Sequence, residues 1–286
     1  MPDWSPAHPV LTAKQFYKIQ TLVYEKCGID LKHGKEELVK ARLGKELRKR
    51  NLASFDGYIQ EVENDRTGEA LIQLINALST NFTHFFREPK HFEILRKHVA
   101  PLWSSRKRAD IWCAAAATGE EPYSILFSLL EELGSGASIR LLASDISTQA
   151  LATAQAGIYP EERLAEIPSA MRSKYFLRGV RHGEALYRVK PEVRQLLEFR
   201  RINLIEPISH SGQFQTIFCR NVMIYFDKST QEKVVRQLSE WLEPGGHLFV
   251  GHAESLNGVR HSLQYVAPAV YRKPAPGAAQ PERRVG

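Results

Sequence analysis

Short apolar runs and helical segments alternate through the second half of the chain. Candidate strands lie at Ala109–Ala114, Ile139–Ser144, Thr216–Arg220 and His247–Gly251, with candidate helices between them at Pro122–Leu133, Ser147–Ala156 and Thr230–Leu242. Strands that alternate with helices in this way run parallel, because each helix carries the chain back to the end of the sheet where the next strand begins. The pattern predicts an α/β domain with a mostly parallel sheet and helices on both faces, closed by a hairpin at Ser262–Lys273.

The alternation is interrupted between about Tyr159 and Leu204. Further short strand candidates lie there, at Arg172–Phe176, Ala185–Val189 and Glu198–Ile202, with turn signals at Arg178–Gly179 and His182–Gly183. We therefore expect a small antiparallel β-subdomain, at about residues 160–203, inserted in an α/β domain that covers residues 100–273.

The first hundred residues show only helical periodicity. Thr12 is suited to cap a helix, Gly28 is suited to end it, and apolar residues recur between them at Phe16, Ile19, Val23 and Cys27. Further helices are expected at 35–50, with Leu38, Leu43 and Leu47 along one side, and at 55–63 and 69–78. Residues 11–99 thus predict a small all-helical domain. The ends, residues 1–10 and 274–286, are expected to be disordered.

Composition excludes several classes of protein. The 286 residues are 43% hydrophobic and 25% charged, as in ordinary soluble proteins, and no apolar run approaches the roughly 18 residues that cross a membrane. The N-terminus does not resemble a secretory signal, and three cysteines without a CxxC pair predict neither a disulfide framework nor a metal site. We expect a cytoplasmic protein with no membrane insertion. The net charge of +7 permits an acidic partner without choosing its class.

The residues that follow the first two strands favour a cofactor without phosphate. Ligands of open α/β sheets bind at the carboxyl ends of the strands. The first loop, Ala114–Gly119, is built of small residues but has one glycine, and Glu120 and Glu121 follow it, so a pyrophosphate would be repelled. S-adenosylmethionine (SAM) carries a sulfonium and an ammonium and suits such a loop, although the glutamates could simply cap the helix. Asp145 ends the second strand and could accept both hydroxyls of a ribose, or could start the next helix.

Two further polar groups complete the pattern. Arg220 and Asn221 follow the third strand, where a cofactor would lie. A polar and aromatic cluster at 78–88 contains Arg87, which could also pair with Glu88 or cap a helix.

These residues together resemble the CheR-type chemoreceptor glutamate methyltransferases. The segments STNFTHFFREPKHF, WCAAAATGEEPYSI, ASDISTQALATAQAGIY, FCRNVMIYFD and GHLFVGHAESL stand in the order and approximate spacing of that family, from about Phe16 to Tyr271 for the whole likeness. The first loop departs from the common pattern at Ala117, where a serine is usual. The resemblance implies a helical N-terminal domain and a Rossmann-like SAM-dependent methyltransferase domain with an inserted β-subdomain.

The resemblance also implies roles for individual residues. Its cofactor contacts fall on Asn81, Thr83, Arg87, Glu121, Asp145, Asn203, Leu204, Arg220 and Asn221. Arg87 would pair with the carboxylate of the cofactor's methionine, and Tyr225 would lie near the transferring methyl, so both are candidate catalytic residues. The product of the cofactor would be S-adenosylhomocysteine, and the acceptor would be a glutamate of a chemoreceptor's cytoplasmic methylation region. That carboxylate is already ionised at pH 7, so no general base is required.

Candidate partner contacts lie on a basic helix. Eight Lys or Arg and three Glu lie between Lys32 and Arg50, and Arg42, Lys45 and Lys49 share one face. This face could dock the acidic methylation region of a receptor or could simply be solvated. The β-subdomain could bind a C-terminal receptor peptide by adding a strand to its edge. We expect a monomer.

Two other functions compete with this interpretation. A nucleic-acid methyltransferase would suit the charge, but the segment Asn221–Tyr225 lacks the prolines of the usual base-methylating motif, and no basic patch with interleaved aromatic residues is evident. No nucleic-acid partner is therefore expected. A non-catalytic module that binds SAM for signalling stays open, because cofactor residues alone do not prove turnover.

Overall fold

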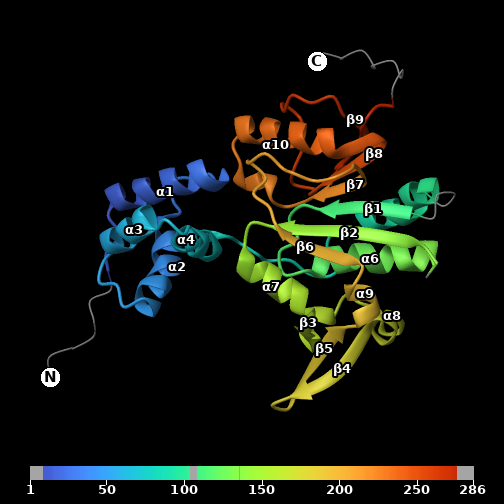
Figure 1. Cartoon of the computed structure of the whole chain (residues 1–286), viewed down its shortest axis with the longest axis horizontal. Coiled ribbons are helices and arrows are strands. Elements are labelled where there is room, and N and C mark those ends of the chain that lie inside the picture. Colours follow the sequence, from blue (N-terminus) through green and yellow to red (C-terminus); the bar gives the residue numbers. More distant parts are fainter. Residues whose placement is uncertain (1–8, 104–107, 135, 276–286) are drawn as a thin grey trace. The chain divides into compact units, whose positions relative to one another are not determined.

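The computed structural model describes residues 9–103, 108–134 and 136–275. The two ends that were predicted to be disordered lie almost entirely outside this part of the chain. The chain divides into two compact units, one formed by Met1–Thr80 with Tyr225–Asp227 and the other by Asn81–Ile224 with Lys228–Gly286 (Figure 1). Among the described residues, no helix combines the length and apolar character needed to cross a membrane.

The first unit contains four helices in its described part. They are α1 (Ala13–Cys27), α2 (Glu36–Lys49), α3 (Phe55–Asn64) and α4 (Glu69–Leu78). The predicted cap is confirmed, since Thr12 and Gln15 form a reciprocal capping box and Gly28 ends α1 with a left-handed φ of 74°. The predicted side of α2 needs one correction: Leu38 is exposed, and Val39 joins Leu43 and Leu47 in the core. Position 39 lies four residues before Leu43, so it shares the helix face.

The second unit is built on a seven-stranded sheet of order β6-β2-β1-β7-β8-β10-β9. These strands are β1 (Arg108–Cys113), β2 (Ser138–Asp145), β6 (Leu197–Arg201), β7 (Phe214–Cys219), β8 (Leu242–Val250), β9 (Gln264–Ala267) and β10 (Val270–Arg272). The first five run parallel, and β9 and β10 form the predicted antiparallel hairpin. The longer helices are α6 (Glu120–Leu133), α7 (Thr148–Ala156) and α10 (Lys228–Trp241), close to their predicted ranges.

Short helical turns complete the second unit. They are α5 (Lys90–Ile94), η1 (Leu95–Val99), η2 (Ala100–Trp103), η3 (Glu161–Leu164), α8 (Ser169–Tyr175), α9 (Pro191–Arg194) and η4 (Met223–Tyr225), of which Tyr225 belongs to the first unit. A second sheet of order β3-β5-β4 is antiparallel and is formed by β3 (Ile158–Pro160), β4 (Phe176–Arg181) and β5 (Glu184–Val189). Figure 1 shows this sheet set apart from the larger one.

The insertion is real, but three of its predicted details are wrong. Arg172–Phe176 was expected to be a strand and is mostly the helix α8. The predicted turn at Arg178–Gly179 lies inside β4, whereas the one at His182–Gly183 is present. Glu198–Ile202 is a strand, but it pairs in parallel with β2 in the larger sheet. Segments this short show too little periodicity to separate helix from strand, so tertiary pairing decided their structure.

A buried core fixes the strands of the larger sheet. Phe218 of β7 stacks on Phe249 of β8 at 4.4 Å between ring centroids, and both side chains are fully buried. Trp112 of β1 is also fully buried, and its indole N–H donates to Ser144 Oγ at 2.8 Å. The carboxyl ends of these strands are therefore held firmly relative to one another.

Candidate active site

The parallel register brings the predicted site residues of the second unit to one edge of the sheet. Cys113 at the end of β1 is paired with Ala143 of β2 and Phe218 of β7, and Asp145 is paired with Arg201 of β6. The loops that follow β1, β2, β6 and β7 consequently leave the sheet side by side. The strand ends, these loops and the first turn of α6 carry the predicted residues Glu121, Asp145, Asn203, Leu204, Arg220 and Asn221.

The loop after β1 lies directly on the strand ends. The backbone N–H of Ala114 donates to Phe218 O at 2.7 Å, and that of Ala116 donates to Ser144 O at 2.8 Å. Gly119 has a φ of 101°, and a Cβ there would lie 2.6 Å from the Tyr159 hydroxyl. Only glycine fits at this position, so the sequence of small residues reflects a close approach of backbone to its neighbours.

Asp145 organises the backbone around itself. Its two carboxylate oxygens accept hydrogen bonds from the backbone N–H groups of Ala117 and Ser147, each at 2.9 Å. Burial raises the pKa of Asp145, and the backbone hydrogen bonds oppose that rise. An aspartate at the end of the second strand is placed as a ribose-binding acid requires. Its contact with ribose stays a prediction.

Arg220 is the centre of a buried ionic network. Its guanidinium contacts Glu121 Oε2 at 2.7 Å and Glu88 Oε2 at 2.9 Å, and it donates to the backbone carbonyl of Arg87 at 2.7 Å. The Arg220 side chain is fully buried. Burial alone would raise the pKa of Glu88, but the hydrogen bond and charge of Arg220 outweigh it and lower that pKa.

The carboxyl group of Glu121 behaves differently from that of Glu88. Burial raises its pKa by more than the charge of Arg220 lowers it. The thiol of Cys113 lies 3.5 Å from Glu121 Oε1 and is also buried. The network thus ties three loops together, and it gives Arg220 a structural role beside its predicted contact with the cofactor, which is untested.

The segment that begins the second unit joins this network. Asn81 Nδ2 lies 3.4 Å from Ser147 Oγ, Thr83 is buried, and the Arg87 guanidinium donates to Phe82 O at 3.2 Å. The predicted alternative pairing of Arg87 with Glu88 is not the one found, since Glu88 binds Arg220 instead. Arg87 remains the predicted partner of the cofactor's carboxylate, for which its planar fork is suited.

Glu254 is a site residue that the sequence reasoning missed. It lies after β8 and accepts hydrogen bonds from the backbone N–H groups of Gly251 and Asn221, both at 2.6 Å. Burial raises the pKa of Glu254, while these hydrogen bonds act to lower it. An acid shortly after a strand end was the available signal, and it was present in the segment GHLFVGHAESL.

Unusual backbone conformations concentrate at this edge of the sheet. Of seven described non-glycine residues with positive φ, four lie in the loops of the site: Phe86, Glu88, Ala117 and Asn221. Such conformations cost about 1–3 kcal/mol each and persist where the surroundings impose them. Their clustering favours a functional site at this edge, and this observation does not depend on the side chains.

Glu88, His91 and His252 form a further cluster in the described part of the chain, with one potential ligand atom from each residue within 4.8 Å of the others. His91 is fully buried, and burial lowers its pKa to about 4. Glu88 Oε2 already accepts from Arg220 and from the His252 backbone N–H at 3.1 Å. The neighbouring guanidinium disfavours a cation here.

The remaining candidate residues lie in two places. Asn203 Nδ2 donates to Glu206 Oε1 at 2.8 Å, and the carbonyl of buried Leu204 accepts from Gln237 at 3.0 Å. Tyr225 belongs to the first unit, where its carbonyl accepts from the Asp30 N–H at 2.8 Å. The predicted role of Tyr225 near the methyl group stays a prediction.

The basic helix α2 contains one residue with a clear structural task. Arg42 donates to the carbonyls of Leu78 and Ser79 at 2.6 and 3.1 Å, and so satisfies the carboxyl end of α4. Lys45 is exposed, and Lys49 lies 3.4 Å from Glu46. Of the predicted partner-binding residues, Lys45 and Lys49 are thus at the surface, whereas Arg42 is engaged within the unit.

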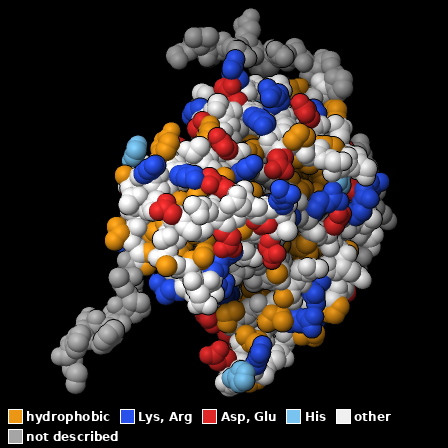
Figure 2. Space-filling model, turned by 60° about the vertical axis from the view of Figure 1, so that its left-hand side comes forward, with side chains coloured by type: hydrophobic (Ala, Val, Ile, Leu, Met, Phe, Trp, Pro, Cys, Tyr) orange, Lys and Arg blue, Asp and Glu red, His pale blue; other side chains and the backbone are white. Residues whose placement is uncertain are grey.

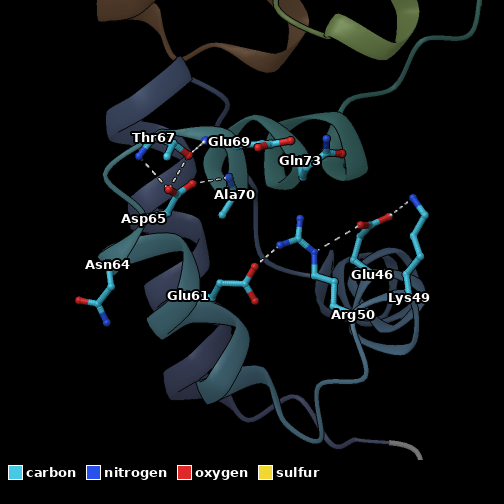
Figure 3. Close-up of a pocket in the computed structure, with 10 residues that line it drawn as sticks. All are labelled: Glu46, Lys49, Arg50, Glu61, Asn64, Asp65, Thr67, Glu69, Ala70 and Gln73. Atoms are coloured by element: carbon cyan, nitrogen blue, oxygen red, sulfur yellow. Dashed lines mark hydrogen bonds and ion pairs between the residues drawn. The ribbon is translucent and has the colours of Figure 1, made fainter.

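Acidic side chains offset much of the charge around this helix. A groove of about 730 Å³ lies beside this helix. In Figure 3, Arg50 points between Glu46 and Glu61, and Lys49 points toward Glu46. On the face shown in Figure 2, Lys and Arg side chains are interspersed with Asp and Glu. Many cations on this face therefore have acidic neighbours, and the picture shows no continuous basic patch there among the described residues.

The small sheet has an edge strand with apolar side chains in solvent. β4 pairs only with β5 among the described strands, and Leu177 and Val180 are 50% and 67% exposed. An edge of this kind can accept an added strand. The predicted receptor peptide at this subdomain is untested.

Comparison with known proteins identifies the two parts of the chain. Residues 81–271 match the family described as CheR methyltransferase, SAM binding domain, and residues 14–79 match CheR methyltransferase, all-alpha domain. The chain is similar to Chemotaxis protein methyltransferase 2 of Pseudomonas aeruginosa, with 41% identity over 91% of this chain and 93% of that protein. It is also similar to the chemotaxis protein methyltransferases of Klebsiella aerogenes, with 41% identity over 91% and 90% of the two chains, and of Escherichia coli, with 37% identity over 91% of each.

The SAM-binding family covers the whole strand-end cluster, and the carboxylate acceptors found there suit a cofactor that carries positive charge and ribose hydroxyls but no phosphate. The cofactor is SAM, and the predicted fold class is confirmed. With the all-helical unit, the inserted sheet and relatives that match over nine-tenths of its length, the chain belongs to the CheR methyltransferase family.

Proposed function

We propose that the protein transfers a methyl group from SAM to glutamate side chains of bacterial chemoreceptors, forming glutamate methyl esters. The observation that carries the proposal is the strand-end cluster of Asp145, Glu121 and Arg220 in a chain whose relatives are chemotaxis protein methyltransferases. The methyl esters would serve sensory adaptation.

The chemistry of a carboxylate acceptor suits this site. Bound SAM supplies a methyl group on a positively charged sulfur. A glutamate has a reference pKa of about 4.3, so it is the anionic nucleophile at pH 7 and needs no base. The chain's own contribution is to hold the cofactor in place: Asp145 would bind the ribose, Arg87 would bind the cofactor's carboxylate, and the Glu121–Arg220 pair would fix the backbone around them.

The partner is expected to meet the helical unit. Lys45 and Lys49 are exposed cations that would attract the acidic methylation region of a receptor, and a receptor's C-terminal peptide could add to the edge strand β4. A monomer in the cytoplasm is the form in which we expect the protein to act. The comparisons favour neither the nucleic-acid methyltransferase nor the non-catalytic module.

The decisive experiment is methyl transfer from labelled SAM to receptor-bearing membranes of the same organism, followed by mild alkali. Carboxyl methyl esters release volatile methanol, so alkali-labile label on the receptor is the expected result. Alkali-stable label would mean N-methylation and would overturn the glutamate assignment. Tight SAM binding with no label on any receptor of the organism would instead favour the signalling module.

The ribose site is tested separately by Asp145→Ala. This variant should lose measurable SAM binding in titration calorimetry while its circular dichroism stays that of the wild type. Asp30→Ala, in the helical unit, is the matched control and should bind SAM normally. Wild-type affinity in Asp145→Ala would contradict the assignment.

A further inference from the structure

The inserted segment contacts the loop Ala114–Gly119, here called the cofactor loop, through two side chains. Tyr159 of β3 donates its hydroxyl hydrogen to the carbonyl of Thr118 at 2.8 Å. Arg163 of η3 donates to Thr118 Oγ1 at 3.3 Å and forms an ion pair with Glu120. Both therefore act on the stretch between the end of β1 and the start of α6, although they lie about forty residues further along the chain.

Loss of the ion pair between Arg163 and Glu120 would destabilise the loop. The Glu120 side chain is fully buried, and its other oxygen accepts from Thr118 Oγ1 at 2.6 Å. The Arg163 guanidinium is the cation that pairs with it, and it reaches the glutamate from a side chain that is still 32% exposed. A buried carboxylate that loses its cation is strongly destabilised, so the conformation of the loop depends on Arg163.

Packing restricts the same loop. A Cβ at Gly119 would lie 2.6 Å from the Tyr159 hydroxyl and 2.8 Å from Ala154 Cβ. Tyr159 is itself buried and packs edge-on against Phe85 at 5.0 Å between ring centroids. The loop is thus held between β3 and α7, with no room to shift toward either.

The restrained loop carries groups of the candidate site at both ends. Ala117 donates its N–H to Asp145, and Glu121 pairs with Arg220. We propose that Tyr159 and Arg163 are positioning residues for SAM binding, so that the inserted subdomain sets the shape of the cofactor loop. This inference rests on the proposed function only for the identity of the cofactor. Because calorimetric titration with SAM needs no receptor, its result does not depend on the receptor assignment.

A matched pair of variants tests the tyrosine. Tyr159 and Tyr187 face each other in the register of β3 and β5, but the Tyr187 hydroxyl donates to Glu161 at 3.0 Å and not to the loop. Tyr159→Phe should weaken SAM binding several-fold, and Tyr187→Phe, which removes the same atom, should leave it unchanged. Equal SAM affinities in the two variants would overturn the role of Tyr159.

A double-mutant cycle tests the arginine. Arg163→Ala should weaken SAM binding roughly 10- to 100-fold, the size expected when a hydrogen bond to a charged group is lost. In a Glu120→Gln background the same change should add little, because the charge that Arg163 neutralises is gone. Fully additive losses would mean that Arg163 does not act through Glu120. A lowered melting temperature with unchanged SAM affinity would reduce it to a structural residue.

Two further variants guard against an effect that comes only from loss of folding. Should Arg163→Ala fail to fold, Arg163→Lys keeps the cation and loses the second hydrogen bond, and an intermediate SAM affinity is expected. Arg172→Ala removes an arginine of the same subdomain that contacts only backbone carbonyls at Ile167 and Ala165. It should leave SAM affinity unchanged, and a loss equal to that of Arg163→Lys would contradict the proposal.

Discussion

Arg220 in the α/β unit and the cations of α2 in the helical unit carry the same charge in different surroundings. Arg220 is fully buried and joins Glu88, Glu121 and a backbone carbonyl. Lys40 and Lys49 of α2 lie 3.4 Å from glutamates one turn away and keep 39% and 71% of their side-chain surface exposed. A buried cation fixes the loops around it, whereas exposed pairs of this kind contribute at most about 1 kcal/mol and leave their side chains available to a partner.

The largest effect should come from breaking the buried network. Arg220→Met leaves the carboxylates of Glu88 and Glu121 without their cation and should lower the free energy of unfolding by about 3–5 kcal/mol. Urea denaturation measures this. Arg260→Ala breaks an exposed pair with Glu232 and should change the stability little. Similar losses in the two variants would remove the contrast between buried and exposed ion pairs.

A smaller effect should appear on acidification, through His91. Burial holds its folded pKa at about 4, below the unfolded value of about 6.5, so the unfolded chain binds more protons between these pH values. Stability should therefore fall as pH falls from about 6.5 to about 4, by on the order of 2–3 kcal/mol from this residue.

The contribution of His91 can be isolated by difference. Urea denaturation of wild type and His91→Gln at neutral and acidic pH should show a smaller acid loss in the variant, with the exposed His33→Gln as control. Parallel pH profiles of wild type and His91→Gln would mean that His91 is not held neutral by the fold.

An intermediate effect on stability is expected within α2 itself. Arg42→Ala removes the donor to the last carbonyls of α4 and should cost about 1–2 kcal/mol in the free energy of unfolding. Lys45→Ala, on the same helix, is the control. If both variants denature at the wild-type urea concentration, the cap on α4 contributes nothing.

The smallest effect on stability is expected from the exposed lysines of α2. Their substitution should instead affect binding to the receptor most clearly. Lys45→Ala and Lys49→Ala should change the free energy of unfolding by less than about 0.5 kcal/mol. Each should weaken binding to receptor-bearing membranes at low salt, and the difference from wild type should shrink at high salt. Receptor affinity that does not respond to salt would exclude α2 as an electrostatic docking surface.

The sequence predicted the helical unit and most of the α/β framework because their long elements have strong periodicity. Thr12, Gly28 and the apolar positions of α1 each appear where local rules place them. The insertion was harder: Arg172–Tyr175 became helical, and Leu197–Arg201 joined the larger sheet beside β2. Pairing between distant segments decided these elements, and it leaves no mark in a run of five residues.

The candidate site was predictable in its residue types but not in its connections. Asp145 and Arg220 follow their strands as expected, yet the choice of Glu88 as the second partner of Arg220 depends on a left-handed backbone at Glu88 itself. Such a conformation is rare for a residue with a side chain and is imposed by the surrounding structure. The pairing of Arg163 with Glu120 likewise required the insertion to be folded.

The helical unit includes three residues from far along the chain, Tyr225–Asp227, and this affects when the unit can finish folding during synthesis. Tyr24 donates its hydroxyl hydrogen to Asp227, and Asp30 donates its N–H to the carbonyl of Tyr225. Since synthesis proceeds from the N-terminus, a nascent chain of eighty residues lacks these contacts. The unit becomes complete only once Asp227 has been synthesised, so a fragment cut at Thr80 is missing part of this unit.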